Sequence, residues 1–122
     1  MPNPSYLALT TMQGQILFSG QLSTITATAI YTVPTGKTCK ITSGTLCNIS
    51  TAAVVVTVSL LKSGDTVDNT HRVISGYTLA GGGTLSLSDF LGGVMLAEGE
   101  SVNVQAGTAA VIDVVLTGAV SS

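Results

Sequence analysis

Apolar and polar residues alternate with a period of two along most of this chain, as they do in half-buried β-strands. Short turn sequences rich in glycine or proline separate the alternating stretches, among them Pro34-Thr35-Gly36-Lys37 and Ala97-Glu98-Gly99-Glu100. Roughly seven to nine short strands with such turns are typical of a β-sandwich. The pattern therefore predicts an all-β protein with a single sandwich of jelly-roll or Greek-key type. The predicted strands cover residues 25–33, 38–49, 54–61, 71–79, 84–90, 101–106 and 111–120.

Local features of the pattern refine this prediction. Residues 54–61 are apolar on both faces, which predicts a central strand that is covered on both sides. Gly44 interrupts the strand of residues 38–49 and is a candidate β-bulge. Leu85 and Leu87 lie two positions apart, so we expect them on one side of a strand over residues 84–90. The polar residues 62–70 are expected to form a loop.

The first 24 residues contain apolar patches without a clear register. Two interpretations remain open: this segment is the first strand pair of the sandwich, or it is an arm that lies on a neighbouring subunit. We therefore divide the chain into residues 1–24 and a β-sandwich domain of residues 25–122. The candidate partner-contact residues are apolar side chains of the first segment: Tyr6, Leu7, Leu9, Ile16, Leu17 and Phe18.

Charged residues are scarce, at 8% of the 122 residues, and the net charge is -2. Average soluble domains carry roughly a quarter charged residues. Because so little charge provides weak repulsion between copies, the composition favours a protein that packs against other protein. No cluster of Lys and Arg is present to neutralise phosphates, so nucleic acid is not an expected partner. No stretch reaches the roughly 20 apolar residues of a membrane helix, and no signal peptide is recognisable.

Residues that could carry catalysis or bind a metal are few and poorly spaced. His71 is the single histidine of the chain, and no Gly-x-Ser-x-Gly sequence accompanies it as in a serine hydrolase. Asp65, Asp68 and Asn69 form a weak candidate for a calcium site, because they lack a regular ligand spacing. We expect no catalytic residue, no cofactor and no metal ion, and therefore no enzymatic activity.

Three further motifs have structural interpretations. Cys39 and Cys47 fall on one predicted strand, about 26 Å apart if it is straight, which is beyond disulfide reach. Gly81-Gly82-Gly83 is followed by a strand pattern, whereas a phosphate-binding loop is followed by a helix. Asn48-Ile49-Ser50 matches the N-glycosylation acceptor pattern, but the chain has no visible secretory signal.

Residues 29–118, about three quarters of the chain, resemble small all-β virion proteins of tailed bacteriophages. The first matching part runs from Ile30 to Thr38 through the Pro-x-Gly-Lys turn, and a second one ends at Cys47-Asn48-Ile49-Ser50. The last part is the segment Leu91 to Val104, which contains the Ala-Glu-Gly-Glu turn. The resemblance is to the head-decoration and minor tail proteins of these phages, and it implies no catalytic residues.

Composition and resemblance together predict a non-enzymatic virion structural protein, made in the host cytoplasm, that decorates or cements the capsid. Its expected partner is the major capsid protein or another virion protein. We also expect a homo-oligomer, with a trimer favoured because trimers fit a lattice with local threefold axes. Two alternatives remain: a minor tail or tail-tip protein that contacts the host surface, and a carbohydrate-binding β-sandwich module.

Overall fold

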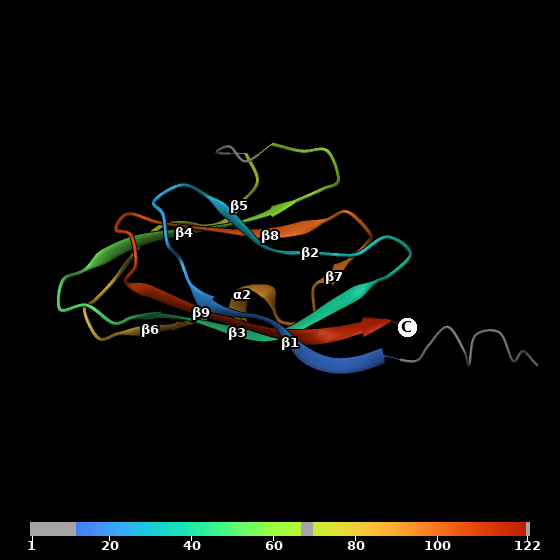
Figure 1. Ribbon diagram of the computed structural model, residues 1–122, viewed down its shortest axis with the longest axis horizontal. Coiled ribbons are helices and arrows are strands. Elements are labelled where there is room, and N and C mark those ends of the chain that lie inside the picture. The colour runs from blue at the N-terminus through green and yellow to red at the C-terminus, as the bar shows by residue number, and fades with distance from the viewer. Residues whose placement is uncertain (1–11, 67–69, 122) are drawn as a thin grey trace, which may run out of the picture.

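The computed structural model describes residues 12–66 and 70–121 of the chain (Figure 1). Strands account for nearly all regular structure in these ranges, and the helix among them is a single turn. In chain order the elements are β1 (Met12–Gln21), β2 (Thr28–Thr32), β3 (Cys39–Asn48), β4 (Val54–Leu61), β5 (Arg72–Leu79), β6 (Thr84–Ser86), α2 (Ser88–Leu91), β7 (Met95–Leu96), β8 (Ser101–Ala106) and β9 (Ile112–Ser121).

The strands form two antiparallel sheets that pack face to face, seen nearly edge-on in Figure 1. One sheet has the order β1-β9-β3-β6, with the two-residue strand β7 added on β3. The other has the order β2-β8-β4-β5. The pairs are nested, with β4 on β5, β3 on β6, β2 on β8 and β1 on β9. This is the strand order of a jelly roll, so the predicted all-β sandwich is confirmed.

The core between the sheets is built from aliphatic side chains at alternate strand positions. In β9 the buried residues Ile112, Val114 and Leu116 follow each other with a period of two, as the sequence predicted. In β4 the residues Val54, Val56 and Val58 do the same from the opposite sheet. No aromatic side chain belongs to the buried core of the described residues, which matches the low aromatic content of 4%.

The predicted strand over residues 84–90 is wrong in its second half. The strand β6 ends at Ser86, and residues 88–91 form the short helix α2. Leu87 donates its N–H to Gly44 O at 2.7 Å, and Leu91 donates to Leu87 O at 2.7 Å. Because Leu87 and Leu91 are both fully buried and four positions apart, their spacing fits one helical turn as well as it fits a strand.

The bulge in β3 also differs from the prediction. The register of β3 against β9 shifts between Ile41 and Ser43, which leaves Thr42 as the extra residue, whereas Gly44 stays in register opposite Leu116. Gly44 is buried, and a Cβ added there would lie 3.0 Å from Val115 O and 3.1 Å from Leu116 Cδ1. Glycine at this position therefore permits close packing and does not mark the bulge.

The central position of β4 is confirmed, because β4 lies between β8 and β5. Its outward side is covered over only part of its length. Ser59 and Leu61 are buried there, at 3% and 7% exposure, but Val55 is 48% exposed. The loop prediction for residues 62–70 agrees with the described part, since Asp65 N donates to Lys62 O at 3.0 Å and closes a turn after β4.

The N-terminal segment is described from Met12 onward. Residues 12–21 form β1, which pairs with β9 at the edge of the five-stranded sheet. A bulge between Ile16 and Phe18 sends their neighbour Leu17 toward the core: Leu17 and Phe18 pack partly buried against it, while Ile16 is 63% exposed. Tyr6, Leu7 and Leu9 lie outside the described residues, so the arm remains a prediction for that part of the chain.

Candidate interaction surfaces

The outward side of the five-stranded sheet, here called the outer face, is a broad surface of small uncharged residues. Residues opposite each other in the ladders point to the same side, so the strand registers define its rows. The rows are Gly14, Ala119, Lys40 and Met95; Ile16, Thr117 and Ser43; Ser19, Val115, Thr45 and Ser86; and Gln21, Asp113, Cys47 and Thr84. In Figure 1 the sheet is the lower layer, and no described element lies beneath it.

Hydroxyl groups on the outer face are bonded to one another. Ser43 Oγ lies 2.7 Å from Thr117 Oγ1, and Thr42 Oγ1 lies 3.3 Å from the same atom. The carboxylate of Asp113 accepts a hydrogen bond of 2.9 Å from Gln21 Nε2. The two charged side chains of these rows, Lys40 and Asp113, lie in the first and last row, so the middle of the face carries no charge.

Several apolar side chains protrude from the outer face. Ile16 is 63% exposed, Met95 is 56% exposed and Val115 is 36% exposed. The face is bordered by the edge strand β1, whose ten residues include no charged residue and no proline. Edge strands of monomeric proteins are usually protected by such residues, so this edge lacks two common barriers to protein contact.

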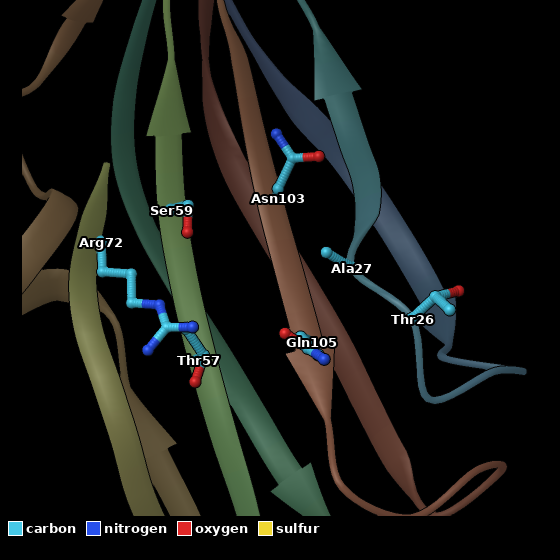
Figure 2. Close-up of a pocket in the computed structure, with 7 residues that line it drawn as sticks. All are labelled: Thr26, Ala27, Thr57, Ser59, Arg72, Asn103 and Gln105. Atoms are coloured by element: carbon cyan, nitrogen blue, oxygen red, sulfur yellow. The ribbon is translucent and has the colours of Figure 1, made fainter. Parts of the chain in front are cut away.

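On the opposite sheet, a groove of about 250 Å³ runs across the outward side of β4 and β8. Figure 2 shows the side chain of Arg72 extending from β5 to β4, where its guanidinium lies beside Thr57. The loop before β2 forms the other side, held by a hydrogen bond of 3.2 Å from Gln105 Nε2 to Ile25 O. The described residues that line the groove are Thr26, Ala27, Thr57, Ser59, Arg72, Asn103 and Gln105.

The structure brings His71 near Asp65, with His71 Nε2 and Asp65 Oδ2 3.9 Å apart. Asp65 Oδ2 also accepts a hydrogen bond from Lys62 N at 3.1 Å, as in a loop that closes on itself. Asp68 and Asn69 lie outside the described residues. Within residues 12–66 and 70–121, no group of three His, Cys, Asp or Glu side chains is placed to hold a metal ion.

Cys39 and Cys47 are free thiols at the two ends of β3, in agreement with the prediction that they form no disulfide. Cys39 is fully buried between the sheets and is hydrogen-bonded to Tyr31 on β2. Burial raises the pKa of the Cys39 thiol above its usual 9.0, although the bond to Tyr31 opposes this shift. The pKa of Tyr31 is raised above 10.0, mainly by burial and to a lesser extent by its electrostatic interaction with Cys39. Cys39 is therefore a core residue that stays protonated at neutral pH.

We expect a thiol reagent to modify Cys47 in the native protein and to spare Cys39. Cys47 is partly exposed on the outer face, whereas Cys39 is enclosed and its thiolate is disfavoured. Titration with a chromogenic disulfide should count one reactive thiol in the native chain and both after unfolding. The variant Cys47→Ser should show none before unfolding, and rapid native reaction of that variant would contradict the placement of Cys39.

The side chain of Asn48 has a structural role that the sequence did not reveal. It is fully buried, and Nδ2 donates to Ala52 O at 2.8 Å and to Leu79 O at 3.1 Å. Oδ1 accepts from Ser50 N at 3.0 Å and from Ser50 Oγ at 2.7 Å. Asn48 thus ties the end of β3 to the end of β5 in the other sheet. In the folded chain its amide is not accessible as a glycosylation acceptor.

The glycines at residues 81–83 lie in the connection from β5 to β6, which crosses from one sheet to the other. A Cβ added to Gly81 would lie 2.4 Å from the backbone of Thr51, so this glycine permits close contact between two loops. The segment leads into β6, as the sequence indicated, and not into a helix that could bind phosphate.

Sequence reasoning identified neither the outer face nor the groove as sets of residues. Both depend on registers between strands that are far apart in the chain, such as β3 with β9. One local signal was available: Asn103 and Gln105 alternate with Val102 and Val104, so β8 presents amide side chains on the side opposite the core.

No protein-family model and no curated protein sequence matches this chain. Among the described residues, no helix has the length and apolar character needed to cross a membrane. The resemblance to phage virion proteins therefore remains a prediction made from the residues that carry it.

Proposed function

We propose that this protein is a non-enzymatic structural component of a tailed-phage virion that decorates or cements the capsid shell. The observation that carries the proposal is the outer face, a surface rich in Thr, Ser, Ala and Val with protruding Ile16 and Met95. Exposed apolar side chains of this kind mark protein contact sites when they gather on one surface.

The chemistry of the outer face favours contact with protein. The transfer of an ion out of water costs far more free energy than the transfer of a hydroxyl group. Burial of these polar groups would cost little hydration free energy, because Thr42, Ser43 and Thr117 are already hydrogen-bonded to one another and Asp113 is hydrogen-bonded to Gln21. A standard interface buries about 800 Å² on each partner, at roughly 25 cal/mol per Å² of apolar area. Such contacts can hold a shell together without covalent bonds.

In this proposal the chain is a homo-oligomer, with a trimer favoured, and it binds the major capsid protein or another virion protein. The resemblance of residues 29–118 to small virion proteins supports the assignment. Jelly rolls are found in viral capsid proteins, in lectins and in cupins, so the fold is compatible with this function but does not assign it.

A charge in the middle of the outer face should weaken assembly. Val115 lies near the centre, opposite Ser19 and Thr45, and is 36% exposed. We expect Val115→Glu to weaken self-association about 100-fold or more, because an unpaired carboxylate would be buried in the interface. Sedimentation velocity over a range of concentrations measures this effect.

The matched control is Val55→Glu on the opposite sheet, where Val55 is 48% exposed. This variant should associate like the original chain. In both variants the free energy of unfolding should stay within about 1 kcal/mol of that of the original chain. A chain that stays monomeric at high concentration, or equal loss of association in both variants, would contradict assembly through the outer face.

The location in the virion needs a separate measurement. Electron microscopy of virions labelled with an antibody to this chain distinguishes capsid decoration from a minor tail protein. In parallel, deletion of residues 1–11 tests the predicted arm and leaves β1 in place. Loss of particle binding with unchanged stability would support the arm, whereas absence of the label from heads and tails would exclude a virion component.

A further inference from the structure

We propose that the groove across β4 and β8 binds an acidic sugar, a uronic acid being the simplest example. This site lies on the sheet opposite the outer face and goes beyond the proposed structural role. Four segments contribute to it: the loop before β2, and the strands β4, β5 and β8 (Figure 2). Its volume of about 250 Å³ lies just below the range of about 300–1,000 Å³ for pockets that take drug-sized ligands. The groove therefore suits a single sugar ring.

The floor of the groove is polar although it is nearly enclosed. Ser59 is 3% exposed and Asn103 is 4% exposed. Asn103 Nδ2 donates to Ser101 Oγ at 3.0 Å, whereas Asn103 Oδ1 and Ser59 Oγ have no hydrogen bond among the described residues. Among the described residues, every side-chain N or O atom that is fully shielded from solvent has a hydrogen-bond partner. Since Asn103 Oδ1 and Ser59 Oγ have none, these two oxygens are not fully shielded and open into the groove. They are available to the hydroxyl groups of a ligand.

The side of the groove supplies one positive charge. Arg72 is exposed and donates from Nη1 to Ser75 Oγ at 3.1 Å, which leaves most of its five N–H groups free for a ligand. None of the described residues that line the groove is acidic, and no described carboxylate lies within ion-pair distance of Arg72. A guanidinium binds a carboxylate by paired, charge-assisted hydrogen bonds.

The combination selects the class of ligand. A carboxylate of the ligand can accept hydrogen bonds from the guanidinium of Arg72. Hydroxyl groups of the same ligand can donate to Asn103 Oδ1, and can donate to or accept from Ser59 Oγ. Ala27 is the single residue with a purely apolar side chain among the described ones that line the groove. No aromatic ring is present for a sugar to stack on, and we therefore expect an affinity in the millimolar range for one sugar unit.

The test is a titration of the ¹⁵N-labelled chain with D-glucuronate, followed by amide chemical shifts. We expect saturable shifts at Ser59, Arg72 and Asn103. D-glucose, which lacks the carboxylate, should bind at least about tenfold more weakly. Acetate, which lacks the hydroxyl groups, should also bind at least about tenfold more weakly. Acetate binding as tight as glucuronate binding would overturn the proposal, because the groove would then recognise an anion and not a sugar.

Two variants examine the contacts. Arg72→Gln should weaken glucuronate binding about tenfold, and Ser59→Ala, which removes one hydroxyl group, should weaken it several-fold. The control Lys40→Gln removes one positive charge from the opposite sheet and should leave the affinity unchanged. Amide spectra of the variants report whether the fold is intact. Absence of saturable shifts, or equal affinities for the original chain and Arg72→Gln, would refute the site.

Discussion

Replacement of Asn48 by alanine is expected to lower the free energy of unfolding by about 3 kcal/mol. The variant loses two hydrogen bonds to backbone carbonyls and two from Ser50, all at a fully buried position. It leaves Leu79 O without this partner and opens a small cavity between the sheets. In a domain of this size the melting temperature should fall by roughly 10 °C, measurable by circular dichroism together with denaturant unfolding.

Asn103→Ala is the matched control for that substitution. Asn103 is nearly as buried, at 4% exposure, but it makes one hydrogen bond, to Ser101 Oγ. We expect Asn103→Ala to cost about 1 kcal/mol. Equal losses in the two variants would mean that burial of an amide, and not the link between the sheets, determines the stability contribution of Asn48.

Replacement of Gly118 by alanine should have a similarly large effect. Gly118 lies in β9 between β1 and β3, and an added Cβ would stand 2.6 Å from Lys40 O and 2.9 Å from Leu17 Cδ1. The backbone of β3 would have to move, since the oxygen of Lys40 belongs to the ladder. We expect a loss of about 3 kcal/mol in the free energy of unfolding, measured by denaturant titration.

Gly14→Ala provides the control in the neighbouring strand. Gly14 is exposed in β1 opposite Ala119, and nothing lies within 4 Å of an added Cβ. The expected change is within about 0.5 kcal/mol in either direction. If Gly118→Ala were as mild as Gly14→Ala, the close approach of β3 and β9 at this point would be contradicted.

The strands were predictable where alternation is regular. Residues 101–106 were predicted with the bounds that β8 has, and the buried face of β9 was identified residue by residue. Prediction failed where one pattern fits two structures. Leu85, Leu87 and Leu91 satisfy a strand up to Leu87 and a helical turn from Leu87 onward. The helical turn is closed by hydrogen bonds from Leu91 N to Leu87 O and from Gly92 N to Ser88 O, which the alternation of apolar residues does not reveal.

The candidate contact residues illustrate the same limit. Ile16, Leu17 and Phe18 are consecutive apolar residues, so alternation alone cannot assign them to a face. The bulge in β1 resolves the ambiguity, because it turns Leu17 and Phe18 toward the core and leaves Ile16 outside. The groove was beyond prediction for another reason: its residues come from four segments whose proximity is set by the jelly-roll order.

The pairing of the first and last strands has a mechanical consequence. Met12 lies opposite Ser121, so both ends of the described chain leave the sheet at the same end of the β1–β9 pair (Figure 1). Antiparallel hydrogen bonds run perpendicular to the strands. Tension on both ends would therefore act along these bonds and break them one after another, as in a zipper. A copy held by its two ends would yield at low force, whereas a copy held across a sheet face distributes the load over a whole surface.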